Sequence, residues 1–183
     1  MRKILFFQWN AFMQKGIERA FTYLGMEYDT FYYIFKDWDK DDDFKEKFKK
    51  RLQSGKEEYE YVFSVNFSPL ISEVCNDLQV KYVSWIYDCP LHIRNKEPMK
   101  YSCNTIFFFD RIEAENYRNK GVNAYHLPLA GDTVAFTEKY KYVDMNMMHN
   151  EEKGIYTGFT ETDMCDVSLV GKLYHSDYAY LLR

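Results

Sequence analysis

Residues 80–90 read VKYVSWIYDCP, an apolar stretch that ends abruptly in an aspartate, a cysteine and a proline. A short apolar run closed by a helix and strand breaker is typical of a strand buried on both faces, as at the centre of a parallel sheet. Proline cannot donate a backbone hydrogen bond to a sheet, so we expect the strand to stop there and to leave Asp88 at its carboxyl end. Ligands of open α/β sheets bind outside the carboxyl ends of strands. Asp88 is therefore the first candidate functional residue.

Stretches typical of strands and helices alternate on both sides of this segment. Apolar, β-branched and aromatic residues predict further strands over residues 3–8, 27–35, 60–66, 105–109 and 122–127. Helical periodicity and end signals predict helices over residues 12–24, 44–52, 69–78 and 113–119. Gly25 follows the first helix, and Ser68-Pro69 opens the third. This alternation predicts an α/β fold: a Rossmann-like, doubly wound, mainly parallel sheet with helices on both faces.

The acidic run at residues 37–43 (DWDKDDD) comes directly before the helix predicted over residues 44–52. Acidic side chains at the start of a helix interact favourably with the helix dipole, so the run needs no metal to explain it. A calcium-binding EF-hand loop is excluded because its central glycine and terminal glutamate are both misplaced here. We therefore predict no metal site.

Composition and charge narrow the class of protein. The 183 residues are 46% hydrophobic and 19% aromatic, which predicts a packed core. The formal net charge of −4 gives no electrostatic basis for binding nucleic acid. No apolar run reaches the roughly 20 residues that span a bilayer, so no membrane span is expected. The four cysteines form no CxxC pair and have no histidine at metal spacing, which indicates free thiols and a cytoplasmic location.

The character of the sequence changes after Gly131. Residues 131–152 are polar and rich in methionine, whereas residues 166–173 (DVSLVGKL) again read as a buried strand. A helix is predicted to begin at Ser176, and the sequence ends at Arg183. We therefore predict a Rossmann-like domain over residues 1–150. Residues 151–183 are expected to form a linker and the first strand and helix of a second, truncated domain.

Polar residues stand at the ends of several predicted strands: Asn10, Asn66, Asp88 and the pair Asp110-Arg111. On a parallel sheet these ends share one edge, so the residues are expected to line one cleft. Asp88 in a partly buried cleft could act as a general base, or it could cap the turn that follows it. The pair Asp110-Arg111 could bind a ligand, or it could form a helix cap with a local ion pair.

Several common nucleotide and hydrolase motifs are absent from the sequence. The first predicted strand is followed by QWNAFMQKG rather than GxGxxG, and there is no P-loop, GxSxG or HExxH motif. Gly171-Lys172 could place a backbone amide and an ammonium group near a phosphate, although a solvated turn lysine is the simpler interpretation.

Five short motifs in a fixed order resemble a known family. They are NFSPLIS (residues 66–72), KYVSWIYDCP (81–90), FFFDR (107–111), HLPLA (126–130) and DVSLVGKLY (166–174). Their order and spacing resemble the N-terminal half of CgeB-like bacterial glycosyltransferases of the GT-B type. The sequence LPLAGDTVAF (127–136) departs from the pattern expected after LPLA.

This resemblance implies an enzyme with two Rossmann-like domains, no obligatory metal and no other cofactor. The first domain would mainly hold a glycan or protein acceptor, and the second would bind the nucleotide-sugar donor. Within such an enzyme, the strand-end positions make Asp88 the candidate for the catalytic base or for orienting the acceptor, and they place Asn10, Asn66, Asp110 and Arg111 along the acceptor cleft. By the resemblance, Lys172 matches a phosphate-contacting base, and together with Gly171 it would contact the donor phosphate. The chain alone is expected to be inactive.

Two alternatives remain open from the sequence. One is a non-catalytic module of the same fold that binds a glycan or a partner protein. The other is a flavodoxin-like or receiver-like switch domain, which is disfavoured because residues 8–10 (QWN) lack the acidic pair that receiver chemistry needs.

Overall fold

The computed structural model describes residues 3–11, 13–55 and 58–131, and every structural statement below concerns these residues. The strand predicted over 166–173, the helix predicted from Ser176, the domain boundary at residue 150, and Gly171 and Lys172 lie outside the described residues.

Strands and helices alternate along the described chain as predicted. The strands are β1 (Lys3–Gln8), β2 (Tyr28–Tyr32), β3 (Tyr59–Val65), β4 (Lys81–Ile86), β5 (Asn104–Phe108) and β6 (Ala124–His126). The helices are α1 (Gln14–Tyr23), α2 (Asp42–Ser54), α3 (Pro69–Leu78) and α4 (Arg111–Arg118), with a 3₁₀ helix, η1 (Glu97–Lys100), between β4 and β5. Strand β4 ends at Ile86, two residues before Asp88, so Asp88 lies just beyond the strand.

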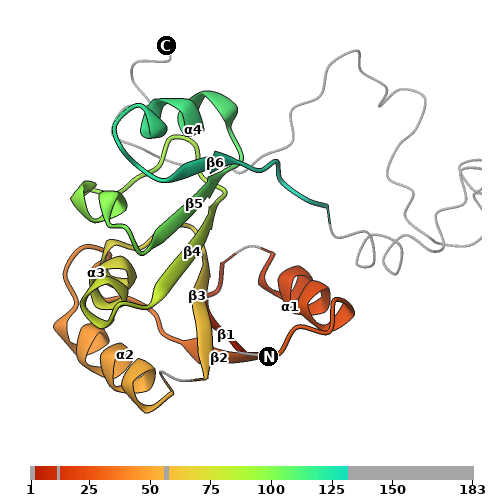
Figure 1. Cartoon of the computed structure of the whole chain (residues 1–183), viewed down its shortest axis with the longest axis vertical. Helices are drawn as coiled ribbons and strands as arrows, with labels where there is room; N and C mark the ends of the chain where they lie inside the picture. The colour runs from red at the N-terminus through yellow and green to blue at the C-terminus, as the bar shows by residue number, and fades with distance from the viewer. Residues whose placement is uncertain (1–2, 12, 56–57, 132–183) are drawn as a thin grey trace, which may run out of the picture. The chain divides into compact units, whose positions relative to one another are not determined.

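The strands form one six-stranded sheet in the order β2-β1-β3-β4-β5-β6, with every neighbouring pair parallel (Figure 1). The Rossmann-like, doubly wound prediction is confirmed. The strand order is the flavodoxin-like variant of this fold, in which the direction of winding reverses between β1 and β3. This point, the switch point, is where ligands of such sheets usually bind.

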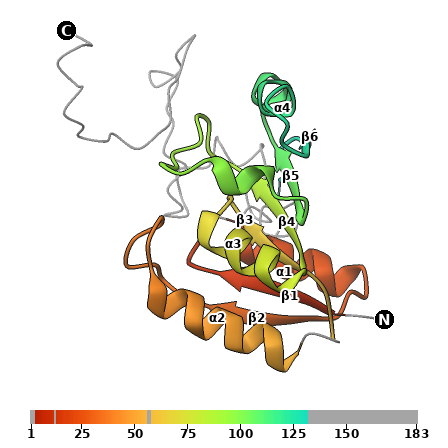
Figure 2. The ribbon, with the colours of Figure 1, turned by 60° about the vertical axis from the view of Figure 1, so that its left-hand side comes forward.

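The two faces of the sheet are covered unequally (Figures 1 and 2). Helix α1 lies on one face, and α2, α3 and α4 lie on the other. The core on the α1 face is the smaller one and consists of Ile4, Phe6, Ile17, Phe21 and Val65. The core on the opposite face is larger and includes Phe7, Phe44, Phe48, Tyr82 and Phe108. Because successive side chains of a strand point to opposite faces, β1 supplies both cores.

Strand β4 is buried on one face and half-buried on the other. Tyr82 and Ile86 are buried in the larger core, whereas Val83 and Trp85, which alternate with them, are only half-buried. The expectation that this strand is buried on both faces is therefore wrong for the α1 face in the described structure. The reason is that α1 packs over β1 and β3, as the smaller core shows.

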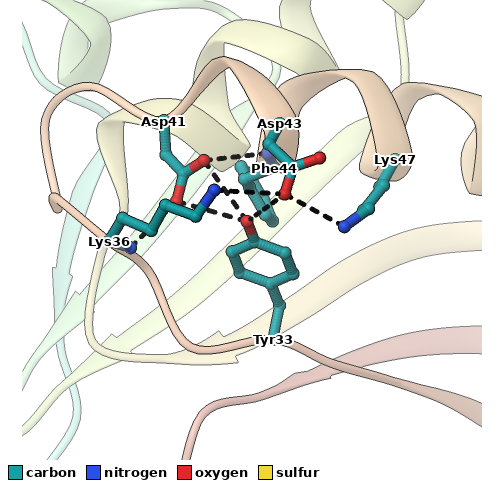
Figure 3. Close-up of polar contacts among 6 residues, drawn as sticks. All are labelled: Tyr33, Lys36, Asp41, Asp43, Phe44 and Lys47. Atoms are coloured by element: carbon teal, nitrogen blue, oxygen red, sulfur yellow. Dashed lines mark hydrogen bonds and ion pairs between the residues drawn. The ribbon is translucent and has the colours of Figure 1, made fainter.

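The acidic run at residues 37–43 starts α2, as predicted (Figure 3). Asp41 is the N-cap, and its carboxylate accepts hydrogen bonds from the backbone N–H groups of Phe44 at 3.0 Å and Lys36 at 2.9 Å. The Tyr33 hydroxyl lies 3.1 Å from Asp43 and 3.3 Å from Asp41. Loss of hydration, together with these two carboxylates, raises the pKa of Tyr33 to about 12. The run is thus explained by helix capping.

Two further turn signals act as the sequence indicated. Ser68 caps α3 by accepting a hydrogen bond from the backbone N–H of Ile71, and Pro69 is the first residue of that helix. Gly25 follows α1 with a backbone φ of 66°, a left-handed conformation that glycine adopts without strain.

The cap at Asp41 has a pH-dependent consequence. Burial alone would raise the pKa of Asp41, but the hydrogen bonds from Lys36, Phe44 and Tyr33 outweigh it and lower the pKa. A carboxyl group whose pKa is lower in the folded state stabilises the fold above its unfolded pKa of about 3.9. That contribution is lost as the pH falls through the folded pKa.

We predict that Asp41→Ala lowers the free energy of unfolding by about 1–2 kcal/mol at pH 7, because several backbone and hydroxyl donors lose their acceptor. The difference from the wild type should shrink as the pH falls below about 4. Urea unfolding at pH 7 and at acidic pH measures both effects. The matched control is Asp42→Ala, an exposed acid of the same turn, which should cost less. An equal loss in both variants would contradict the capping role.

Candidate functional site

The predicted site residues lie where parallel strands end. Asn10 follows β1, Asn66 follows β3, Asp88 follows β4, and Asp110 follows β5. Because these four strands are parallel, their carboxyl ends share one edge of the sheet. Asn10 and Asn66 flank the switch point between β1 and β3, where the crevice of a doubly wound sheet is expected.

Asn66 and Asp88 are in direct contact. The side-chain amide of Asn66 donates a hydrogen bond from Nδ2 to Oδ2 of Asp88 at 2.7 Å. Its Oδ1 accepts from the backbone N–H of Tyr87 at 2.8 Å, and its own backbone N–H donates to the carbonyl of Trp85 at 2.9 Å. Asn66 therefore continues the pairing of β3 with β4 beyond the last strand residues. Its φ of 59° is left-handed, a conformation that asparagine tolerates better than most residues.

The surroundings of Asp88 differ from the expectation. Its side chain is exposed, so the prediction that Asp88 lies in a partly buried cleft is wrong. Because β4 ends two residues earlier, Asp88 projects beyond the sheet rather than into it. Its Oδ2 accepts from Asn66, and within the described residues its Oδ1 accepts no hydrogen bond. It is Asn66, and not Asp88, that satisfies a backbone group of this turn.

Asp110 is the N-cap of α4, which is the helix-cap interpretation that the sequence offered beside ligand binding. Its Oδ1 accepts a hydrogen bond from the backbone N–H of Glu113 at 2.7 Å. The ion pair expected between Asp110 and Arg111 is not formed in the described structure, where Arg111 is exposed.

The edge between β4 and α4 is acidic. Partial loss of hydration raises the pKa of the Cys89 thiol, and the charges of Glu113 and Asp110 raise it further. These carboxylates therefore lie within electrostatic reach of the residue next to Asp88. An acidic edge of this kind favours a neutral or positively charged group near Asp88 over a bare anion.

Trp9 bridges the switch point and was not singled out from the sequence. Its indole Nε1 donates to the backbone carbonyl of Val65 at 3.0 Å, joining the end of β1 to the end of β3. The same ring packs edge-to-face on Trp38 with ring centres 4.7 Å apart. Asn10, the next residue, is exposed with a left-handed φ of 67°, and within the described residues no hydrogen bond joins it to Asn66 or Asp88.

Arg94 connects two loops at this edge that are far apart in the sequence. Its guanidinium donates to Asp37 at 2.5 Å and to Asp39 at 2.8 Å, and the backbone N–H of Asn95 donates to Asp39 at 3.2 Å. The loop after β4 is thereby tied to the loop before α2. The hydrogen bonds from Arg94 lower the pKa of Asp37. No sequence signal pointed to this pairing, because Arg94 lies outside every predicted element.

A cavity of about 360 Å³ lies between α1 and the half-buried face of β4. Trp85 and Tyr87 line it, whereas Asp88 does not. The sequence showed many aromatic residues but gave no way of placing them. The described residues contain no group of three or more histidine, cysteine, aspartate or glutamate side chains arranged to hold a metal ion. Nor does any helix in the described ranges have the length and apolarity needed to cross a membrane.

We predict that Asn66→Asp lowers the melting temperature at pH 7 by a few degrees. The new carboxylate would keep the acceptor for the Tyr87 N–H but would face the carboxylate of Asp88 across a former hydrogen bond. The double variant Asn66→Asp/Asp88→Asn restores a donor and an acceptor with the roles exchanged, so it should recover most of the loss. A thermal melt of the single and double variants measures this. No recovery in the double variant would show that the two side chains are not coupled.

Comparison with known proteins adds no relative: no family model, no curated protein and no solved structure matches this chain.

Proposed function

We propose that this chain is the acceptor-side domain of a CgeB-like bacterial GT-B glycosyltransferase. The enzyme would transfer a sugar from a nucleotide-sugar donor to a hydroxyl group of a glycan or protein, without a metal or another cofactor. The observation that carries this proposal is the contact between Asn66 and Asp88 at the carboxyl edge of the sheet. The order of the five sequence motifs supports it.

The contact supports a general-base role for Asp88. The hydrogen bond from Asn66 holds one carboxylate oxygen of Asp88, and the other accepts no hydrogen bond within the described residues. The exposed position lets a bulky glycan or protein hydroxyl reach that oxygen. In the transfer step the acceptor oxygen bonds to the anomeric carbon, and Asp88 takes the hydroxyl proton. The bond from that carbon to the donor phosphate breaks, and the nucleotide leaves with the electron pair.

The remaining site residues have supporting roles in this proposal. Asn10, Asp110 and Arg111 lie at the same edge and would contact the acceptor. Gly171 and Lys172, outside the described residues, would contact the donor phosphate in a second domain. Most donor contacts would belong to that second domain, so residues 1–183 alone would not transfer sugar. The cysteine pattern supports a cytoplasmic location.

The second candidate is a non-catalytic module of the same fold that binds a glycan or a partner protein. The exposure of Asp88 favours this candidate, because a general base is more often at least partly shielded from water. Both candidates use the same edge of the sheet, and nucleotide-sugar binding and sugar transfer distinguish them.

We predict that Asp88→Asn, made in a full-length protein that contains this chain, lowers kcat/KM for sugar transfer about a hundredfold or more. Donor affinity measured by calorimetry should be unchanged, because the donor would bind mainly elsewhere. The matched control is Asp77→Asn, the same substitution at an exposed position on α3, which should leave transfer unchanged.

Three other outcomes would change the assignment. Transfer that is equal in both variants would remove the catalytic role of Asp88 but keep the enzyme. Sugar transfer by residues 1–183 alone would refute the need for a second domain. A full-length protein that binds no nucleotide sugar would favour the binding module.

A further inference from the structure

The cavity between α1 and β4 has walls from three parts of the chain. Helix α1 contributes Gly16, Ala20 and Tyr23, strand β4 and the residue after it contribute Trp85 and Tyr87, and the segment after β6 completes the lining. At about 360 Å³ it falls in the range of roughly 300–1,000 Å³ that small-molecule sites occupy. It lies on the α1 face of the sheet, where β4 is only half-buried.

The aromatic walls of the cavity are already in place. Trp85 is anchored by its indole N–H, which donates to the backbone carbonyl of Leu127 at 3.1 Å. The Trp85 and Tyr87 rings meet edge-to-face, with ring centres 4.8 Å apart. A ligand would therefore meet a preformed corner of two rings, which reduces the entropy lost on binding. Tyr23, which is 90% exposed, stands at the rim.

Tyr87 carries a hydroxyl group that lacks a partner. The hydroxyl is buried and forms no hydrogen bond within the described structure. A buried donor without an acceptor is costly, by more than an ordinary hydrogen bond contributes. Burial raises the pKa of Tyr87 to about 12, so the hydroxyl keeps its proton at neutral pH. The hydroxyl is closed to solvent in this structure, so a ligand acceptor reaches it only when the Tyr87 ring turns toward the cavity.

The rest of the lining is mainly apolar. Among the described residues that line the cavity, Arg19 alone carries a charge. The others are aliphatic, aromatic or glycine. A sugar ring would have to leave several hydroxyl groups without partners on such walls, which is unfavourable. A flat aromatic ring loses little hydration and gains contacts with the faces and edges of Trp85 and Tyr87.

We propose that this cavity binds a flat, mainly apolar aromatic molecule with one hydrogen-bond acceptor, which accepts a hydrogen bond from the Tyr87 hydroxyl. The site is separate from Asp88 and does not depend on the sugar-transfer function proposed above. Its occupancy would place a small aromatic ligand between α1 and β4.

Coumarin is a suitable probe because it is a flat, fused ring system with a single carbonyl acceptor. We expect it to bind the full chain saturably, with a dissociation constant in the millimolar range or tighter, measured by ligand-observed NMR and calorimetry. Methyl β-glucoside, a sugar of similar size, should neither bind there nor compete.

Ala20→Leu and Tyr87→Phe test where coumarin binds, and Thr22→Leu is the control for introducing a leucine on α1. Ala20→Leu fills the cavity from α1 and should weaken coumarin binding about tenfold or more. Thr22→Leu places the same side chain on the same helix away from the lining, and should leave binding unchanged. Tyr87→Phe keeps the ring and removes the hydroxyl, and should weaken binding about two- to tenfold.

The inference is overturned if coumarin does not bind saturably, if Ala20→Leu and Thr22→Leu bind it equally, or if the glucoside competes with it. Binding that is insensitive to Tyr87→Phe would overturn the role of the hydroxyl. Circular dichroism of each variant checks that α1 remains folded. None of these measurements uses sugar transfer, so failure of the proposed enzyme function would leave the result intact.

Discussion

The parallel pairing of β3 with β4 is the constraint on which the described structure depends. These strands lie at the centre of the sheet, and their side chains build the larger core against α2, α3 and α4. Asn66 extends this pairing past the strand ends through its backbone and both side-chain polar atoms. The left-handed turn at Asn66 is compatible with this role because asparagine tolerates a positive φ. The position of Asp88 follows from the turn that comes directly after the pairing of β3 with β4.

The carboxyl edge of the sheet is organised by side chains that bind backbone groups and one another. Asp41 and Asp110 cap helices, and Arg94 ties two loops together through Asp37 and Asp39. The acidic character of this part of the chain thus comes from structural carboxylates. Asp88 differs from them because its partner is a side-chain amide, and the chemical role proposed for Asp88 rests on this difference.

The two regions with functional potential differ in their chemistry. The edge around Asp88 is polar and exposed, which suits a hydroxyl acceptor carried by a large molecule. The cavity beside α1 is open on one side and lined mainly by aromatic and aliphatic residues, which suits a small flat ring. Both regions depend on β4. Successive residues of a strand point to opposite faces of the sheet, and the turn after β4 places Asp88 beyond the sheet. One stretch of sequence therefore supplies two kinds of surface.

The sequence by itself determined the strands, the α-helices and the fold class of the described residues. Apolar runs predicted every strand that the structure describes. Ser68-Pro69, Gly25 and the acidic run before residue 44 predicted helix ends, because these signals act within a few residues. The tertiary structure alone decided the strand order, the exposure of Asp88 and its contact with Asn66. It also decided the pairing of Arg94 with Asp37 and Asp39, and the cavity lined by Trp85 and Tyr87. Each of these joins residues that are distant in sequence or depends on which helix covers a strand. Local propensity carries no information about such contacts, because they form only when the sheet brings separate segments together.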